Sequence, residues 1–231
     1  RRARPRRGDG LGDACDPDID GDTLPNSYDP HPKVKDTLYY AKLLGSAKSD
    51  MYTNGTWTVS GSKLCHNDST WHAGCRLKDS LISQKDYLVD TRFTVTKVGT
   101  LSSGFPAAGL GFRYSQVSIY KAYLCVVDFK SYRLVLGRIN DFNWTKLKES
   151  AAGSVPKTGP YRIRARAVGS SLTCQLVPSG PTLTATDSTY TSGTAGLLTD
   201  HAEVCGEHLV VIKPRHRSFH PPFRSIVKYA T

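Results

Sequence analysis

The sequence lacks several features that mark common classes of protein. No stretch approaches about eighteen consecutive apolar residues, the length a transmembrane helix needs, so no membrane span is expected. Its six cysteines include no C-x-x-C pair and no Cys/His spacing typical of zinc ligands, which favours disulfides. No nucleic-acid-binding motif accompanies the net charge of +11. A basic surface therefore indicates an acidic polysaccharide or glycan as partner rather than nucleic acid.

Residues that mark a catalytic centre are also scarce. Glycoside hydrolysis commonly uses two carboxyl groups that face one cleft. Residues 30–212 contain three glutamates, Glu149, Glu203 and Glu207, and none lies in an E-x-D-x-x-E pattern. No G-x-S-x-G elbow, the usual setting of a nucleophilic serine, is present. The sequence favours a non-catalytic protein, with a glycoside hydrolase or polysaccharide lyase as the alternative.

Helical periodicity is nearly absent after residue 35, and alternation of apolar and polar residues dominates. In Tyr161–Val168, the clearest example, apolar or small residues alternate with three arginines. One short helix is predicted at Thr37–Leu44. Strands are predicted at Thr56–Ser60, Tyr87–Val95, Ala108–Tyr114, Ser118–Asp128, Tyr132–Ile139, Tyr161–Val168, Ser171–Leu176, Thr194–Leu198 and His208–Ile212. So many half-buried strands predict an all-β fold, a β-sandwich or jelly roll.

Seven aspartates, with no glutamate and no basic residue, lie between Asp9 and Asp29. Such a run repels itself unless a divalent cation collects the carboxylates, and calcium prefers six to eight oxygen ligands. Asp18, Asp20, Asp22, Asn26 and Asp29 stand at positions 1, 3, 5, 9 and 12 of a twelve-residue loop. This spacing predicts a Ca²⁺ site, whereas the alternative is a solvated acidic linker.

The stretch from Gly8 to Asp29 resembles the thrombospondin type 3 repeat, a calcium-binding motif without a conventional hydrophobic core. Thr23 departs from it, because the family has glycine at this sharp turn and a β-branched residue resists positive φ. The resemblance adds three ligands from a preceding loop: Asp9, Asp13 and Asp16. The first ligand positions of that loop hold Pro5 and Arg7, so the chain is expected to be a fragment of a longer repeat array.

From Gly55 to Ile212 the sequence resembles a laminin-G-like or concanavalin A-like lectin jelly roll, as in bacterial secreted or surface proteins. The resemblance is carried by G-T-W-T-V-S-G-S-K-L (55–64), A-G-L-G-F-R-Y (108–114), the Tyr161–Val168 strand and T-D-S-T-Y-T-S-G-T-A-G-L-L (186–198). The expected organisation is a disordered basic flank (1–8), the calcium repeat (9–29), a linker (30–35), the jelly-roll domain (36–212) and a basic tail (213–231).

A sandwich of this kind can bind sugars through arginine donors and aromatic rings on one sheet face. The candidate carbohydrate-binding residues are Arg113, Tyr120, Tyr123, Asp128, Arg138, Arg162, Arg164 and Arg166. The alternative is that the arginines line an ordinary solvated face. A separate alternative is a structural adhesion domain that binds an extracellular protein. Asp187 and Asp200 are candidates for a second calcium site, as the family often binds one at a rim.

The cysteines are assigned from their positions along the chain. Cys65 and Cys75 bracket a polar loop and are predicted to bridge it, while one pair is predicted among Cys125, Cys174 and Cys205. Disulfides and calcium loops of modest affinity both suit an oxidising, calcium-rich exterior. The protein is therefore expected to be secreted or displayed at the cell surface.

Overall fold

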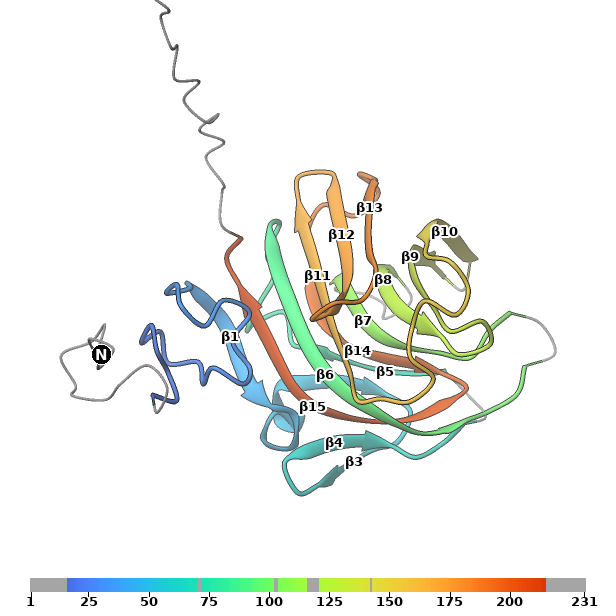
Figure 1. The fold of residues 1–231 in the computed structure, drawn as a ribbon, viewed down its shortest axis with the longest axis horizontal. Coiled ribbons are helices and arrows are strands. Elements are labelled where there is room, and N and C mark those ends of the chain that lie inside the picture. The colour runs from blue at the N-terminus through green and yellow to red at the C-terminus, as the bar shows by residue number, and fades with distance from the viewer. Residues whose placement is uncertain (1–15, 70–71, 102–103, 116–120, 142, 215–231) are drawn as a thin grey trace, which may run out of the picture.

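A computed structural model shows an all-β sandwich of two sheets, with a short irregular segment packed against one side (Figure 1). The structure describes residues 16–69, 72–101, 104–115, 121–141 and 143–214. The strands are β1 (Leu38–Leu43), β2 (Met51–Asn54), β3 (Trp57–Ser60), β4 (Lys63–His66), β5 (His72–Leu77), β6 (Tyr87–Val98), β7 (Ala107–Tyr114), β8 (Lys121–Asp128), β9 (Arg133–Asn140), β10 (Asn143–Glu149), β11 (Tyr161–Val168), β12 (Ser171–Val177), β13 (Thr182–Thr186), β14 (Thr194–Asp200) and β15 (Ala202–Ile212). Two 3-10 turns, Leu44–Ser46 and Lys48–Asp50, connect β1 to β2.

The two sheets are antiparallel throughout the described strands. The eight-stranded sheet has the order β13-β12-β11-β6-β15-β4-β3, and β1 pairs with the far end of β15. The seven-stranded sheet has the order β10-β9-β8-β7-β14-β5-β2. Strands distant in sequence are neighbours in both sheets, so this topology confirms the predicted jelly-roll class.

Alternation along the strands divides each sheet into an inner and an outer face. In β11, Tyr161, Ile163, Ala165 and Ala167 are buried in the core, while the intervening arginines lie on the outer face. The seven-stranded sheet differs because its outer face is also apolar. Ala107, Ala122, Leu124, Val126 and Val135 form a second cluster there, separate from the core between the sheets.

Strand predictions with strong alternation agree with the structure, and the bounds of Tyr161–Val168 are those of β11. The helix predicted at Thr37–Leu44 is wrong. Leu38–Leu43 forms β1, because the edge of β15 offers a hydrogen-bonding partner from Ile212 to His208. Long-range pairing outweighs local propensity in this segment. The structure also contains strands that the sequence did not predict: β1, β2, β4, β5, β10 and β13.

Two disulfides join the described cysteines. Cys125 on β8 bonds to Cys174 on β12 across the core, which agrees with one pair among the three strand cysteines. The predicted Cys65–Cys75 bridge is wrong, since Cys65 bonds to Cys205, its direct neighbour on β15. Cys75 is buried and free, because β5 belongs to the opposite sheet and points Cys75 into the core. Within the described residues, no helix is long and apolar enough to cross a membrane.

Candidate functional site

The aspartate loop brings its carboxylates together as the spacing predicts. Ligand oxygens of Asp18, Asp20 and Asp22 all lie within 4.8 Å of one another. Asp18 also shapes the loop, since its carboxylate accepts hydrogen bonds from the backbone N–H groups of Gly21 and Thr23 at 2.8 and 3.1 Å. Oδ2 of Asp20 is buried with no hydrogen-bond partner among the described residues. The loop thus collects negative charge that its own hydrogen bonds do not neutralise.

Thr23 adopts the conformation that the family reserves for glycine. Its φ is 78°, in the left-handed region that a β-branched residue resists. The Thr23 N–H donates to Asp18, so the turn is held by the same carboxylate that would bind a cation. The sequence correctly locates the turn that requires positive φ, and threonine accepts that conformation.

A second acidic cluster, which sequence reasoning missed, lies where the loop meets the sandwich. Oxygens of Asp22, Asp29 and Asp36 lie within 4.8 Å of one another, and all three residues are buried. Burial raises the pKa of Asp29 to about 7; the His31 N–H opposes this shift and the neighbouring carboxylates add to it. Oδ2 of Asp29 has no partner among the described residues. The equal seven-residue steps from Asp22 to Asp29 and on to Asp36 were the available sequence signal.

Of the remaining predicted metal ligands, two form hydrogen bonds that hold the loop, and two lie outside the described residues. Asn26 uses its side chain to fasten the loop: Oδ1 accepts from the Ile19 N–H at 3.1 Å, and Nδ2 donates to the Asp16 carbonyl. The Asp16 carboxylate accepts from the Asp18 N–H at 2.8 Å. Asp9 and Asp13 lie outside the described residues.

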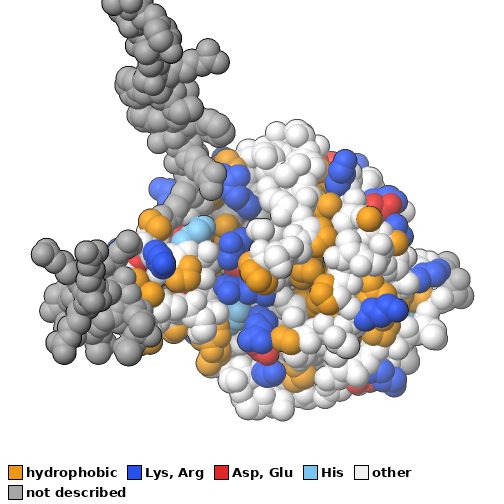
Figure 2. Space-filling view, viewed as in Figure 1, with side chains coloured by type: hydrophobic (Ala, Val, Ile, Leu, Met, Phe, Trp, Pro, Cys, Tyr) orange, Lys and Arg blue, Asp and Glu red, His pale blue; other side chains and the backbone are white. Residues whose placement is uncertain are grey.

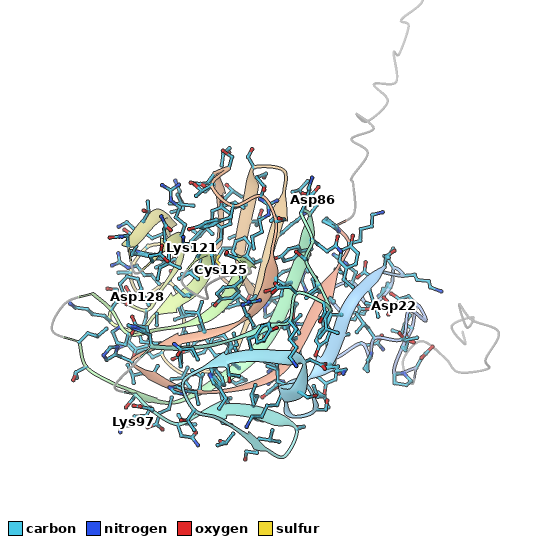
Figure 3. The ribbon with its side chains drawn as sticks, turned by 180° about the vertical axis from the view of Figure 1, so that it is seen from behind. Asp22, Asp86, Lys97, Lys121, Cys125 and Asp128 are labelled. Carbon is cyan, nitrogen blue, oxygen red and sulfur yellow. A yellow bond between two sulfur atoms is a disulfide. The ribbon has the colours of Figure 1, made fainter. Side chains whose placement is uncertain are left out.

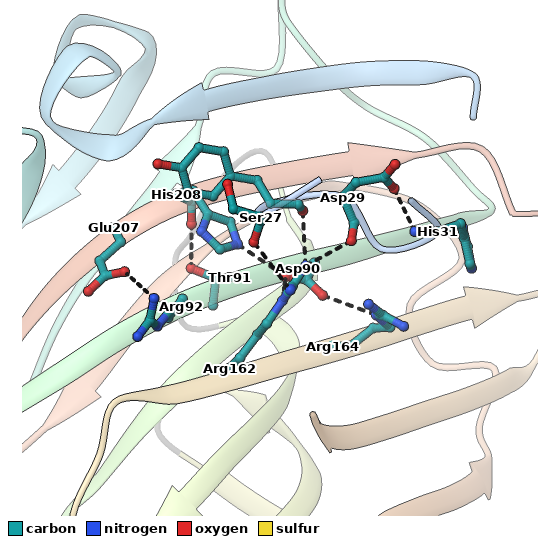
Figure 4. A network of polar contacts seen from close by, with 11 residues as sticks. Ser27, Asp29, His31, Asp90, Thr91, Arg92, Arg162, Arg164, Glu207 and His208 are labelled. Carbon is teal, nitrogen blue, oxygen red and sulfur yellow. Dashed lines mark hydrogen bonds and ion pairs between the residues drawn. The ribbon is translucent and has the colours of Figure 1, made fainter. Parts of the chain in front are cut away.

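Two of the three β11 arginines form ion pairs with a buried aspartate, so they are not simply exposed on an open surface. Asp90 on β6 is fully buried and accepts from Nε of Arg162 at 2.7 Å and Nε of Arg164 at 3.0 Å (Figure 4). Nε2 of His208 lies 3.1 Å from the same carboxylate. Burial alone would raise the pKa of Asp90, but His208 and the two guanidinium groups outweigh it and hold the pKa below its usual value. Arg166 is half-buried further along the strand.

Arg162 also attaches the aspartate segment to the sandwich. Arg162 donates to the carbonyl oxygens of Tyr28 at 3.0 Å and Asp29 at 3.2 Å. The Tyr28 ring packs 5.0 Å from the His208 ring, and Leu24 is buried against the outer face of β6 and β15. Figure 2 shows Lys and Arg side chains gathered in a column over this sheet face. Of the predicted arginine stripe, Arg162 therefore holds the protein's own N-terminal segment, while Arg164 pairs with Asp90.

The other predicted carbohydrate residues are mostly structural. Arg113 is buried and donates to the carbonyls of Lys85 and Tyr190. Tyr123 and Arg138 both contact the Asp187 carboxylate, so with Arg113 they hold the loop of residues 187–190. Burial raises the pKa of Tyr123 to about 12.

Asp128 is the last residue of β8, and Figure 3 places it on the opposite side of the molecule from Asp22. It is fully buried, accepts backbone hydrogen bonds from the following turn and pairs with Arg133. The surface-binding expectation is therefore wrong for Arg113, Tyr123 and Asp128, since their side chains are covered by the fold. Tyr120 lies outside the described residues.

A cavity of about 330 Å³ opens instead on the outer face of the seven-stranded sheet. Its floor contains Leu124, Val126 and Leu198 from β8 and β14. Two aromatic residues, Phe105 and Trp144, form one wall, and their rings meet edge to face at 6.2 Å. Across the floor stand the polar residues Asn54, His72 and Asp200. The cavity is therefore an apolar trough with an aromatic side and a polar side.

Glycines in the middle of strands let the aromatic rings lie on the sheet. A Cβ on Gly137 would stand 2.3 Å from Cη2 of Trp144, and one on Gly111 would stand 2.1 Å from Cε2 of Tyr114. Gly109 and Gly196 occupy further outward positions on β7 and β14. Glycine inside a strand often marks the close approach of a ligand or another chain segment. Outward glycines in neighbouring strands were thus the sequence signal for this cavity, which was missed.

The polar side is organised by Asp200. Its Oδ1 lies 2.6 Å from Nδ1 of His201 and 3.6 Å from Nδ1 of His72. The Asp200 side chain is 39% exposed, so its carboxylate can accept a further hydrogen bond from a ligand. Asp200 is not part of a clustered cation site in the described residues, so the structure lends no support to its prediction as a second calcium ligand.

Comparisons with known proteins agree with both parts of the structure. Residues 6–35 match the thrombospondin type 3 repeat family. Residues of the sandwich superpose on the carbohydrate-binding module CBM66 from Bacillus subtilis with a TM-score of 0.60 and 18% identity, covering 71% of this chain and 96% of that one. A B. subtilis protein of unknown function with a galectin-like fold gives a TM-score of 0.58 at 14% identity, covering 77% and 96%.

A third similar structure is the GH43 protein BlXynB from Bacillus licheniformis, with a TM-score of 0.54 and 12% identity. The match covers 75% of this chain but 39% of that one. No curated protein sequence matches the chain. Residues 6–35 therefore match a thrombospondin type 3 repeat, and the sandwich that follows has the jelly-roll fold of these solved structures.

Proposed function

We propose that this protein is an extracellular, non-catalytic carbohydrate-binding module whose glycan lies in the outer-face cavity. The observation that carries the proposal is the half-buried Trp144 ring, which lies across an apolar floor from amide, imidazole and carboxylate groups. Aromatic rings stack on the C–H face of a sugar while flanking polar groups bond its hydroxyls. The similarity to CBM66 supports the same interpretation.

Replacing Trp144 with alanine is expected to weaken glycan binding at least about tenfold, because the stacking wall is lost. A glycan array should identify the ligand, and isothermal titration calorimetry should compare the variants. Tyr52→Ala is the matched control, since Tyr52 is an exposed aromatic residue that does not line the cavity. Equal binding by the wild type and Trp144→Ala would place the glycan elsewhere and refute the proposal.

The cavity supports binding over hydrolysis. Its described lining contains one carboxylate, Asp200, whereas the common glycosidase mechanisms require two. A reducing-sugar assay on the glycan that binds best separates the two functions. Product release that is abolished in Asp200→Asn would favour the hydrolase alternative.

The aspartate segment is proposed to bind calcium through both acidic clusters. Asp18, Asp20 and Asp22 supply one set of oxygens, and Asp22, Asp29 and Asp36 supply another. Carboxylate oxygens are the ligands that calcium prefers, and the unpartnered oxygens of Asp20 and Asp29 are available to it. Two disulfides among the described residues agree with an extracellular location.

Asp20→Ala is expected to reduce calcium affinity about tenfold or more, because one ligand is lost and the remaining carboxylates still repel one another. Calcium titration calorimetry checks this result. Asp86→Ala removes an aspartate that belongs to neither acidic cluster and should leave the affinity unchanged. Unaltered calcium uptake in Asp20→Ala would contradict the assignment of the loop.

A further inference from the structure

We infer that the sugar held by the cavity is uncharged and lays an apolar ring face or methyl substituent on the floor of the trough. This inference rests on the proposed function and narrows it. It also replaces the acidic glycan that the basic composition of the chain suggested. Three features of the cavity carry it: the charge of the lining, the chemistry of the floor and the position of one acceptor.

The charge of the lining is unfavourable for an acidic sugar. No lysine or arginine is among the described residues that line the cavity, and Asp200 contributes a negative charge. Arg76 on β5 does not line the cavity. It pairs with Asp79 at 3.0 Å and stacks 4.8 Å from the Tyr52 ring centre. The internal stretches that the structure does not describe, 70–71, 102–103, 116–120 and 142, contain no charged residue. Among the described residues that line the cavity, a carboxylate or sulfate would therefore meet the negative charge of Asp200 and no lysine or arginine.

The floor suits an apolar group. Leu124, Val126 and Leu198 face the cavity, and Phe105 and Trp144 close one side of it. A sugar surface rich in hydroxyls would lose hydrogen bonds to water over these side chains and would not regain them. The volume of about 330 Å³ is at the lower end of the range for ligand pockets and suits about one sugar ring.

The polar side then sets the orientation of the ring. Both histidine contacts of Asp200 use Oδ1, which leaves Oδ2 to accept a hydrogen bond from a sugar hydroxyl. Asn54 stands on the same side of the cavity. A neutral sugar ring fits this lining when its hydroxyls meet the polar side and its C–H face or a methyl group meets the apolar floor.

The test uses matched methyl glycosides of glucose, galactose and mannose, each as the hexoside, the 6-deoxy sugar and the uronic acid. Saturation-transfer NMR and competition titrations with the full chain in calcium give relative affinities. In at least one series the hexoside is expected to bind about tenfold more tightly than its uronic acid, because of repulsion from Asp200. The 6-deoxy sugar is expected to bind about fourfold more tightly than the hexoside, because a methyl group is buried.

Two variants and one control distinguish the outcomes. Asp200→Asn should remove most of the discrimination against the uronic acid, whereas Glu203→Gln on β15, in the other sheet, should not. The uronic acids could bind as tightly as the hexosides and lose that binding in Trp144→Ala. This result would overturn the inference and leave the proposed function intact. If no sugar shows binding that depends on Trp144, the proposed function fails and the inference fails with it.

Discussion

Asp90→Ala is expected to lower the free energy of unfolding by about 3–5 kcal/mol, the usual cost of removing one partner from a buried charge network. Asp90 is fully buried and accepts from Arg162, Arg164 and His208. The substitution removes the carboxylate that the guanidinium groups of Arg162 and Arg164 and the imidazole of His208 share. Those groups cannot be fully rehydrated while Tyr28 and Leu24 cover the sheet face.

Chemical denaturation monitored by circular dichroism measures this loss. Asp141→Asn is the matched control, because Asp141 is an exposed aspartate paired with Lys121 at 3.0 Å and asparagine tolerates its positive φ of 47°. Surface ion pairs contribute about 0–1 kcal/mol, so the control should hardly change the unfolding free energy. Equal effects from the two substitutions would show that the Asp90 network does not hold the structure together.

The network also predicts the direction of one pH effect. The pKa of Asp90 is lower in the folded protein than in the unfolded chain, so its contribution is fully present above the unfolded value of about 4. That contribution is lost as the pH falls through the lower, folded pKa. Asp90→Asn should therefore flatten the acid limb of the stability curve, and an unchanged acid limb would contradict this assignment.

Calcium is expected to raise the unfolding free energy by about 1.5–3 kcal/mol at a concentration ten to a hundred times its dissociation constant. For a chain of this size the melting temperature should rise by about 4–10 °C. Asp22→Ala should abolish this increase, because Asp22 belongs to both acidic clusters and its Oδ2 accepts from the Asp36 N–H at 2.9 Å. Melting curves in calcium and in chelator check the result.

A second variant tests how the stabilisation reaches the sandwich. Arg162 holds the carbonyls of Ser27, Tyr28 and Asp29, so order imposed on the loop by calcium is transmitted to β11 and β6. Arg162→Ala should still bind calcium, but calcium should then stabilise the protein less than in the wild type. A full calcium-dependent shift in Arg162→Ala would show that this contact does not couple the two parts.

Local patterns in the sequence were sufficient for the features that depend on neighbouring residues. The Asp18, Asp20 and Asp22 spacing brings three carboxylates within 4.8 Å because a short loop has few ways to arrange alternate side chains. The bounds of Tyr161–Val168 follow from strict alternation, since a strand with one buried face leaves no choice of register. The turn at Thr23 was likewise located by its place in the loop.

The partners of side chains depended on tertiary proximity that no local pattern contains. The three arginines of β11 form one stripe in the sequence pattern, yet Arg162 and Arg164 meet Asp90, which lies 72 and 74 residues earlier in the chain. Cys65 bonds to Cys205 rather than to the nearby Cys75, because sheet order and not sequence distance places the sulfur atoms side by side.

By itself, therefore, the sequence determined an all-β chain with an aspartate loop of calcium-ligand spacing, because periodicity and loop chemistry act over a few residues. Only the tertiary structure formed the cavity in which we propose that a glycan binds. The cavity combines side chains from strands that adjoin only in the folded sheet, such as β5, β8, β10 and β14. Folding also gave two of the predicted arginines partners within the protein, because a charge on a partly covered sheet face requires a partner. Arg162 and Arg164 pair with Asp90, and Arg162 also holds the N-terminal segment.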